Sequence, residues 1–341
     1  MAKQGRIFAV IFLALLIPVL LKAPESEAKV YRGKCKSNLT WSYDSKTKTM
    51  VIDCKGDMPD DEQFYDLDMG WRKYYFKTKK VILKKGISSI GAGAFYNFQK
   101  LEEVVLPEGL RIIKYDAFDG CRKLQFINKP STLEVIEKDV FWDVKIKSIS
   151  LKNLKKLGSE CFSGAKLQSV DIPAKCKIED SVFWSCKKLK KVTFEKGVKR
   201  ISYGMFRETG IKNIDIPGSV AQIGTYAFAN CQSLKKAIIN EGVKKISKDA
   251  FSNTALEEIT IPSTVTELGK NAFRWESTEK SSLKKVVIRS KNIKKWGTMV
   301  FGATRDDLVI YVPQSKKAEY EKILRSTNGL DFHAKIVGKK W

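Results

Sequence analysis

The chain contains a single histidine, His333, near its C-terminus and far from any serine or cysteine motif. It also lacks the G-x-S-x-G and H-E-x-x-H motifs and a phosphate-binding glycine loop, which mark common hydrolases, metalloproteases and nucleotide-binding enzymes. The paired carboxylates of a glycoside hydrolase can come from distant segments, but no pair stands out. We therefore predict no catalytic residues and no cofactor, and keep a glycan-acting enzyme as a remote alternative.

Metal-binding patterns are missing as well. None of the seven cysteines forms a C-x-x-C pair, so the sequence does not indicate a zinc site. Six carboxylates gather in one segment without the regular ligand spacing of a calcium loop: Asp57, Asp60, Asp61, Glu62, Asp66 and Asp68. We predict no metal site. Cys35 and Cys54 flank a predicted hairpin and are candidates for a disulfide in an oxidising compartment; the odd total leaves at least one thiol.

Only one long apolar run occurs, from Ile7 to Leu21, and it follows the basic residues Lys3 and Arg6. Small residues then precede a possible cleavage point after Ala28. This order is typical of a signal peptide over residues 1–28. The alternative is an uncleaved anchor, although the run is shorter than the ~20 residues of a spanning helix. We predict a secreted or cell-surface chain without a transmembrane helix after cleavage.

Acidic side chains are few relative to basic ones. The chain has 38 Asp and Glu and 63 Lys and Arg, which gives a net charge of +25. Removing residues 1–28 changes this by a single charge. Such an excess favours adsorption to anionic polymers outside the cell. The lysines are spread along the whole chain, so the sequence predicts no specific nucleic-acid site. A charged surface that only keeps the protein soluble explains the same composition.

What the chain does contain is a repeat. Ten phenylalanines each follow a large apolar residue by five positions, and successive copies are mostly 21 to 23 residues apart. The phenylalanines are Phe95, Phe118, Phe141, Phe162, Phe183, Phe206, Phe228, Phe251, Phe273 and Phe301. A short β-branched run precedes each copy, as in Ile214-Asp215-Ile216-Pro217. A period of this length is the mark of a solenoid whose units stack to share one core.

The segments on either side of the repeats read as caps. Alternating residues around Trp41 and Ile52, with a turn between, predict a β-hairpin in residues 29–77. Residues 307–341 begin with a strand that ends at Pro313, and Ser315 is a plausible N-cap for a helix after it. The predicted organisation is therefore a signal peptide (1–28), an N-terminal cap (29–77), repeats (78–306) and a C-terminal cap (307–341).

The repeat unit, with its strand, proline, Val-x-x-Ile-Gly and Ala-Phe-x-x-Cys as in residues 214–234, resembles the BspA-type leucine-rich repeats of bacterial and protist surface proteins. The resemblance covers about 80% of the chain. It implies a right-handed leucine-rich repeat coil with a parallel β-sheet, about ten repeats of ~22 residues, a hairpin N-cap and a helical C-cap. It also implies export, surface adhesion or recognition, and no cofactor. The family supplies no shared ligand-binding residue.

A binding surface follows from the strand alternation, since every second side chain of a strand points outward. The outward positions from the middle strands are Phe126, Asn128, Ser148, Ser150, Ser169, Asp171, Lys191, Thr193, Asn213 and Asp215. Small polar residues dominate this row, and Phe126 is its aromatic member. We predict that it binds an extracellular protein or glycan. The alternatives are an unoccupied strand face, or a basic structural protein held electrostatically on the cell wall.

Overall fold

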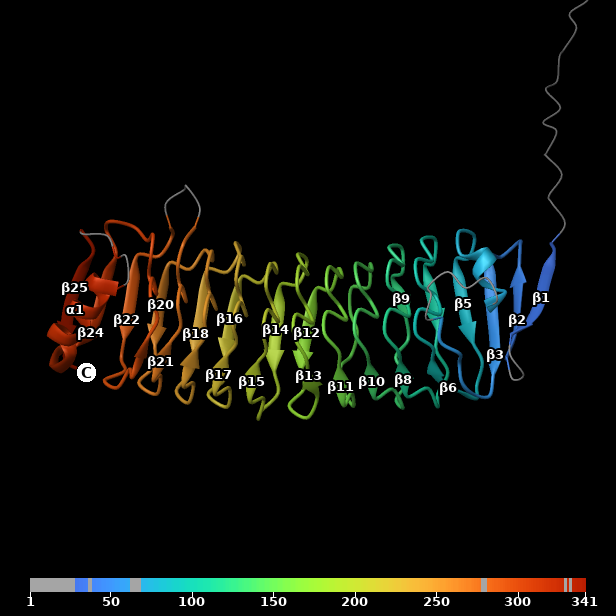
Figure 1. Cartoon of the computed structure of the whole chain (residues 1–341), viewed down its shortest axis with the longest axis horizontal. Coiled ribbons are helices and arrows are strands. Elements are labelled where there is room, and N and C mark those ends of the chain that lie inside the picture. Colours follow the sequence, from blue (N-terminus) through green and yellow to red (C-terminus); the bar gives the residue numbers. More distant parts are fainter. Residues whose placement is uncertain (1–27, 36–38, 62–68, 277–280, 328–329, 331–332) are drawn as a thin grey trace, which may run out of the picture.

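The structure, a computed structural model, describes residues 28–35, 39–61, 69–276, 281–327, 330 and 333–341. The repeats stack into an elongated rod, with the first strand at one end and the C-terminal helix at the other (Figure 1). The predicted solenoid with parallel sheets is confirmed, with about 11 turns. Nearly all of the predicted signal peptide lies outside the described residues. The predicted domain boundaries stay predictions.

Every repeat except that of Phe162 contributes strands to two faces of the rod, whereas the sequence pattern predicts one strand per repeat. The β-branched runs form what we call the long-strand face. Its strands are β5 (Lys80–Leu83), β7 (Glu103–Val105), β9 (Phe126–Ile127), β12 (Ser169–Ile172), β14 (Lys191–Phe194), β16 (Asn213–Ile216), β18 (Lys236–Ile239), β20 (Glu258–Ile261), β22 (Lys285–Ile288) and β24 (Val309–Pro313). Where they pair with one another, they run parallel.

The second row, the short-strand face, is formed mainly by strands that end at the apolar partner of each phenylalanine. These strands are β4 (Gly56–Asp57), β6 (Ile87–Ile90), β8 (Ile112–Ile113), β10 (Val135–Ile136), β11 (Lys156–Leu157), β13 (Lys177–Ile178), β15 (Arg200–Ile201), β17 (Gln222–Ile223), β19 (Lys245–Ile246), β21 (Glu267–Leu268) and β23 (Lys295–Trp296). They pair in parallel too. Runs of two residues are too short to be recognised by alternation in the sequence.

Among the described residues, the long-strand face is divided into four sheets: β1-β2-β3-β5-β7-β9, β12-β14, β16-β18 and β20-β22-β24-β25. The divisions follow a spacing in the sequence. Where the next core leucine or isoleucine comes six positions after a repeat phenylalanine, as after Phe183 and Phe228, the strand that follows pairs with its predecessor. Where the spacing is five, as after Phe206 and Phe251, it does not. A turn that is one residue shorter fails to bring the strand into register with its neighbour.

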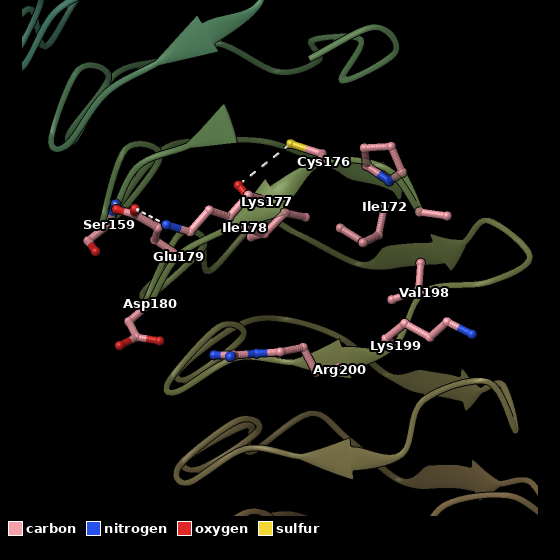
Figure 2. Close-up of a pocket in the computed structure, with 12 residues that line it drawn as sticks. Ser159, Ile172, Cys176, Lys177, Ile178, Glu179, Asp180, Val198, Lys199 and Arg200 are labelled. Carbon is pink, nitrogen blue, oxygen red and sulfur yellow. Dashed lines mark hydrogen bonds and ion pairs between the residues drawn. The ribbon is translucent and has the colours of Figure 1, made fainter. Parts of the chain in front are cut away.

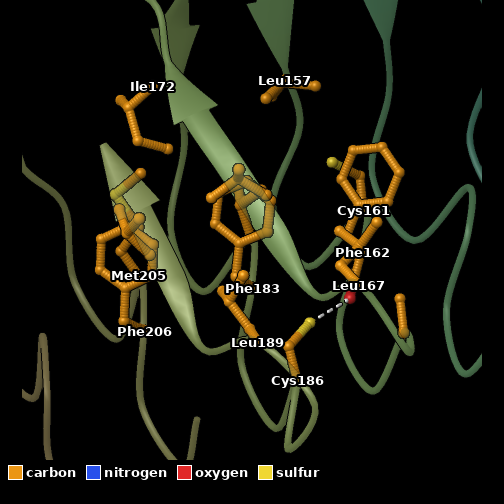
Figure 3. Close-up of a cluster of buried hydrophobic side chains, with 14 of the residues drawn as sticks. Leu157, Cys161, Phe162, Leu167, Ile172, Phe183, Cys186, Leu189, Met205 and Phe206 are labelled. Carbon is orange, nitrogen blue, oxygen red and sulfur yellow. Dashed lines mark hydrogen bonds between the residues drawn. The ribbon is translucent and has the colours of Figure 1, made fainter. Parts of the chain in front are cut away.

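The core is a stack of phenylalanine rings that runs through all the repeats. Ring centroids of successive repeat phenylalanines lie 5.1 to 6.0 Å apart, at interplanar angles of 1 to 18°. Figure 3 shows Phe162, Phe183 and Phe206 from the middle of this stack among leucine, isoleucine and methionine side chains. Offset stacking of this kind adds to the free energy gained by burying each ring.

Cysteines fill small apolar positions beside the ring stack. The Sγ of Cys186 donates to the carbonyl oxygen of Phe162 at 3.0 Å (Figure 3). Cys121 and Cys231 make the same bond to the phenylalanine carbonyl of the preceding repeat. Burial raises the pKa of the Cys186 thiol to about 12, so this side chain stays protonated at neutral pH.

The N-terminal cap covers the first edge of the array. Strands β2 (Leu39–Asp44) and β3 (Thr49–Cys54) form the predicted antiparallel hairpin, and β3 pairs in parallel with β5. Strand β1 (Val30–Cys35), which the sequence did not predict, adds an outer antiparallel strand. The rings of Tyr43 and Tyr74 stack at 4.3 Å and join the hairpin to the 3₁₀ helix η2 (Arg72–Tyr74).

Cys35 and Cys54 lie on β1 and β3, and both are opposite Leu39 of the intervening strand β2. Two strand spacings amount to ~10 Å, whereas a disulfide joins Cα atoms that are within ~7 Å. A bond between these cysteines therefore requires this edge of the sheet to rearrange, and the disulfide stays a prediction.

The acidic residues near position 60 attach the cap to the first repeats. Asp57 accepts hydrogen bonds from two serine hydroxyls, both at 2.7 Å, and Asp60 binds the Nζ of Lys114 at 2.9 Å. Asp61 and Arg72 form an almost completely buried ion pair at 3.3 Å. The remaining members of the predicted cluster, Glu62, Asp66 and Asp68, lie outside the described residues.

At the far end, the predicted helical cap is confirmed as the 3₁₀ turn η3 (Gln314–Lys316) followed by α1 (Lys317–Thr327). Tyr320 of α1 is completely buried, and its hydroxyl donates to the carbonyl oxygen of Ser290 at 3.2 Å. A strand that the sequence analysis missed, β25 (Lys335–Lys339), then pairs in parallel with β24. Within the described residues, no helix has the length and hydropathy of a membrane span.

Candidate ligand-binding surfaces

The ten side chains predicted to face outward are all exposed. Parallel pairing of β12 with β14 places Ser169 beside Lys191 and Asp171 beside Thr193. Ser148 and Ser150 lie outside any strand, Phe126 and Asn128 lie at and just after β9, and Asn213 and Asp215 belong to β16. Because β16 does not pair with β14, the row is interrupted rather than continuous. A binding role for these residues stays a prediction.

Several polar members of the row already have partners in neighbouring repeats. The Asn128 side chain accepts from the Leu106 N–H at 2.7 Å and donates to the Leu106 carbonyl at 2.8 Å. The Thr193 hydroxyl donates to Asp171, and Asn240 donates to Asp215 at 2.6 Å. These side-chain hydrogen bonds join neighbouring repeats in addition to, or in place of, backbone bonds between their strands. They make Asn128, Asp171 and Asp215 parts of the scaffold before any ligand is considered.

Phe126 is the most exposed large apolar side chain on this face, with 61% of its surface accessible. It begins β9, a strand of only two residues, and the neighbouring Gln125 is exposed as well. Exposed apolar side chains that cluster together often mark contact sites, whereas single ones are common on protein surfaces.

A pocket of about 350 Å³ opens on the opposite, short-strand face, where β13 and β15 are not paired (Figure 2). We call it the break pocket. Its lining residues are Ser159, Ile172, Pro173, Ala174, Cys176, Lys177, Ile178, Glu179, Asp180, Val198, Lys199 and Arg200. Among the described residues, every other neighbouring pair of strands on this face is joined. The sequence analysis did not predict this pocket.

A signal for the break pocket is nevertheless present in the sequence. Three residues before its apolar partner, each repeat places a buried aliphatic side chain: Ile87, Leu110, Leu133, Leu154, Val198, Val220, Val243, Val265 or Ile293. The repeat of Phe183 has the exposed Lys175 there instead. Its connection from Ile172 to Ile178 spans six positions, whereas the next repeat needs seven between Phe194 and Ile201. The missing aliphatic group leaves part of the core layer unfilled.

A third feature is an aromatic and basic cluster on the turns that carry the repeat phenylalanines. The Arg207 guanidinium carbon lies 5.5 Å from the Trp184 ring centroid and 5.6 Å from that of Tyr226. The Lys248 ammonium lies 5.6 Å from the same tyrosine ring, and Tyr203 packs edge-on against it. Cation–π contacts of this kind hold the side chains together across four repeats.

Carboxylates gather on the same edge of the rod in earlier repeats. Burial, followed by the nearby charges of Asp116 and Asp139, raises the pKa of Asp119 to about 7. Burial and the charge of Asp139 likewise raise the pKa of Glu160. No group of three His, Cys, Asp or Glu side chains in the described residues has an arrangement that could hold a metal ion. His333 is exposed in a turn after the helical cap.

Comparison with family models identifies the repeat. A model described as BspA type leucine rich repeat region, with six copies, matches residues 73–187 and 155–280, which together exceed half of the chain. The chain belongs to this family. The BspA-type repeats include both the predicted outward row and the break pocket. Comparison with the curated proteins gave no match.

Solved structures with similar folds are leucine-rich repeat proteins too. One from Bacteroides ovatus is 22% identical, with a TM-score of 0.58 and coverage of 89% of each chain. Another, from Eubacterium ventriosum, is 20% identical, with a TM-score of 0.58 and coverage of 83% of this chain and 84% of that one. At such identities the likeness shows the shared BspA-type solenoid fold and carries no residue-level assignment.

Proposed function

We propose that this protein is an exported, non-enzymatic recognition protein that binds a protein or glycan outside the cell through its long-strand face. The observation that carries the proposal is the exposure of Phe126 beside small polar side chains on one side of a rigid solenoid. Membership of a repeat family found on surface proteins supports it, as does the signal-peptide pattern in residues 1–28. A rigid array of strands loses little conformational entropy when such groups bind a partner.

The second candidate is a basic structural protein held on the cell wall by charge. The net charge of +25 favours it, and so do exposed lysines in successive repeats, such as Lys188, Lys212 and Lys236. Binding of this kind is spread over many weak contacts, so it falls steeply as salt screens the charges.

The two functions separate in a binding experiment on purified protein with immobilised matrix proteins, mucins and acidic glycans. Each ligand is tested at low salt and at ~0.5 M salt, where the screening length falls to a few Å. Recognition through the long-strand face predicts a selective signal that survives high salt and weakens in Phe126→Ala. The matched control is Phe76→Ala, which removes an exposed phenylalanine from the N-terminal cap. Signals on every polyanion that vanish together in salt favour the structural alternative.

A further inference from the structure

The break pocket has backbone groups that lack the partners found elsewhere on the short-strand face. In each other repeat from that of Phe118 onward, the residue after the apolar partner donates its N–H to the preceding repeat, as Gly224 does to Ile201 at 2.9 Å. Among the described residues, no backbone bond joins β13 to β15. In a parallel ladder of this direction, the Ile178 carbonyl therefore faces the break. The β13 side of the pocket therefore offers a hydrogen-bond acceptor, the Ile178 carbonyl.

Charged side chains lie at one end of the pocket. Figure 2 shows the Arg200 guanidinium extending toward the end that holds Glu179 and Asp180. Glu179 forms ion pairs with Lys156 at 3.3 Å and with Lys177 at 3.5 Å. Within the described part of the chain, Arg200 and Asp180 make no ion pair. This end therefore presents a cation and an anion, each with capacity for a ligand of opposite charge.

The other end of the pocket is apolar. Ile172 is 1% exposed and Val198 is 5% exposed, and Pro173 and Ala174 complete this part of the lining. Figure 2 shows Ile172 and Val198 away from the carboxylates, with the Lys199 side chain extending beyond Val198. The end arises where the repeat lacks its aliphatic side chain, so a ligand group of that kind restores the lost contacts.

The opening is too narrow for an added strand. The rings of Phe183 and Phe206, which belong to the repeats on either side, remain 5.7 Å apart. The Ser202 hydroxyl also reaches across to the Glu179 carbonyl at 2.8 Å. Inserting a strand would double the spacing to about 9.6 Å. The occupant is therefore a small molecule, and a volume of about 350 Å³ is in the range of small-ligand sites.

We propose that the break pocket binds a free α-amino acid with a branched aliphatic side chain. Its carboxylate pairs with Arg200. Its ammonium pairs with Asp180 and donates to the Ile178 carbonyl. Its side chain occupies the apolar end against Val198. This site is separate from the long-strand face, so it stands whether or not that face binds a macromolecule.

Cys176 provides a direct readout, because it lines the pocket and is the one cysteine of the seven, all within the described residues, that is not buried. Its thiol is alkylated with iodoacetamide at mildly alkaline pH, and the rate is followed by mass spectrometry. Burial raises the pKa of Cys176 to about 11, so the reaction is slow enough to follow. L-leucine is expected to slow it. The probes 4-methylpentanoate and 3-methylbutylamine keep the side chain but each lack one charge, and are expected to protect about tenfold less well.

Variants then test the assigned groups. Arg200→Gln and Asp180→Asn, both at exposed positions, are expected to weaken protection by leucine about tenfold. Lys244→Gln, which removes an exposed cation from the same face two repeats away, leaves it unchanged. Ala174→Trp fills the pocket and abolishes protection, with circular dichroism as the check on folding. Equal protection by leucine and 4-methylpentanoate, protection by glucose, or no protection at ~10 mM leucine would each overturn the proposal.

Discussion

The ring stack makes a quantitative prediction about Phe228. This side chain is completely buried, and its ring stacks on Phe206 at 5.4 Å and on Phe251 at 5.1 Å. Replacing a buried phenylalanine by alanine costs about 3–5 kcal/mol through lost transfer free energy and the cavity left behind. Two repeats hold this site on either side, so little collapse is available. We expect Phe228→Ala to lower the free energy of unfolding by about 4 kcal/mol.

Two matched variants test the reasoning behind that magnitude. Phe301 is equally buried, but its ring has a repeat neighbour on one side only, Phe273. Phe301→Ala should therefore lower the free energy of unfolding by less than Phe228→Ala does. The difference should be about the free energy of one aromatic contact, 0.5–1.5 kcal/mol. Phe126→Ala, at an exposed position, should cost less than about 0.5 kcal/mol.

The assay is urea unfolding followed by circular dichroism, with the slope of the transition compared between variants. In a solenoid, each repeat is stabilised by its neighbours, so a defect at the centre weakens two interfaces. If Phe228→Ala costs no more than Phe126→Ala, or no more than Phe301→Ala, the stack is not the element that couples the repeats.

Two further predictions concern buried charges. Asp61→Ala removes the buried ion pair with Arg72 and should cost about 3 kcal/mol in urea unfolding, whereas Glu102→Ala, in an exposed pair, should cost under about 1 kcal/mol; equal costs would contradict the stabilising role of the buried pair. Burial raises the pKa of Asp119 from 3.8 to about 7, so its folded state favours the protonated form, and the stability it contributes is present below pH 3.8 and is lost as pH rises through about 7. Asp119→Asn should therefore unfold at higher urea than the parent at pH 8, with the difference shrinking by pH 4; a difference independent of pH would refute this.

The sequence predicts the solenoid, its shared core and both caps because these features rest on local and repeated information. A phenylalanine at a constant offset from an apolar residue meets its own copy once the units stack. The same regularity predicts which side chains of the strands are exposed. Phe126 could therefore be placed on the surface without knowing its neighbours.

Features that depend on one missing or shifted residue were harder to predict. The five-residue spacing after Phe206 and Phe251 and the lysine at position 175 are visible in the sequence. Their consequences, a divided sheet and a pocket, appear only when each repeat is placed against the next. The acidic segment is similar: Asp60 and Asp61 read as an isolated cluster until the fold brings Lys114 and Arg72 to them.

By itself, then, the sequence determined the repeat, its core and the outward orientation of the strand residues, because periodicity alone decides which side chains are buried. The tertiary structure decided the second row of strands, the divisions of the long-strand face and the charged, apolar-ended break pocket. Each of these depends on hydrogen bonds and contacts between residues about 20 positions apart. Whether such groups meet is set by the register of neighbouring turns, and a single-residue difference in length changes that register.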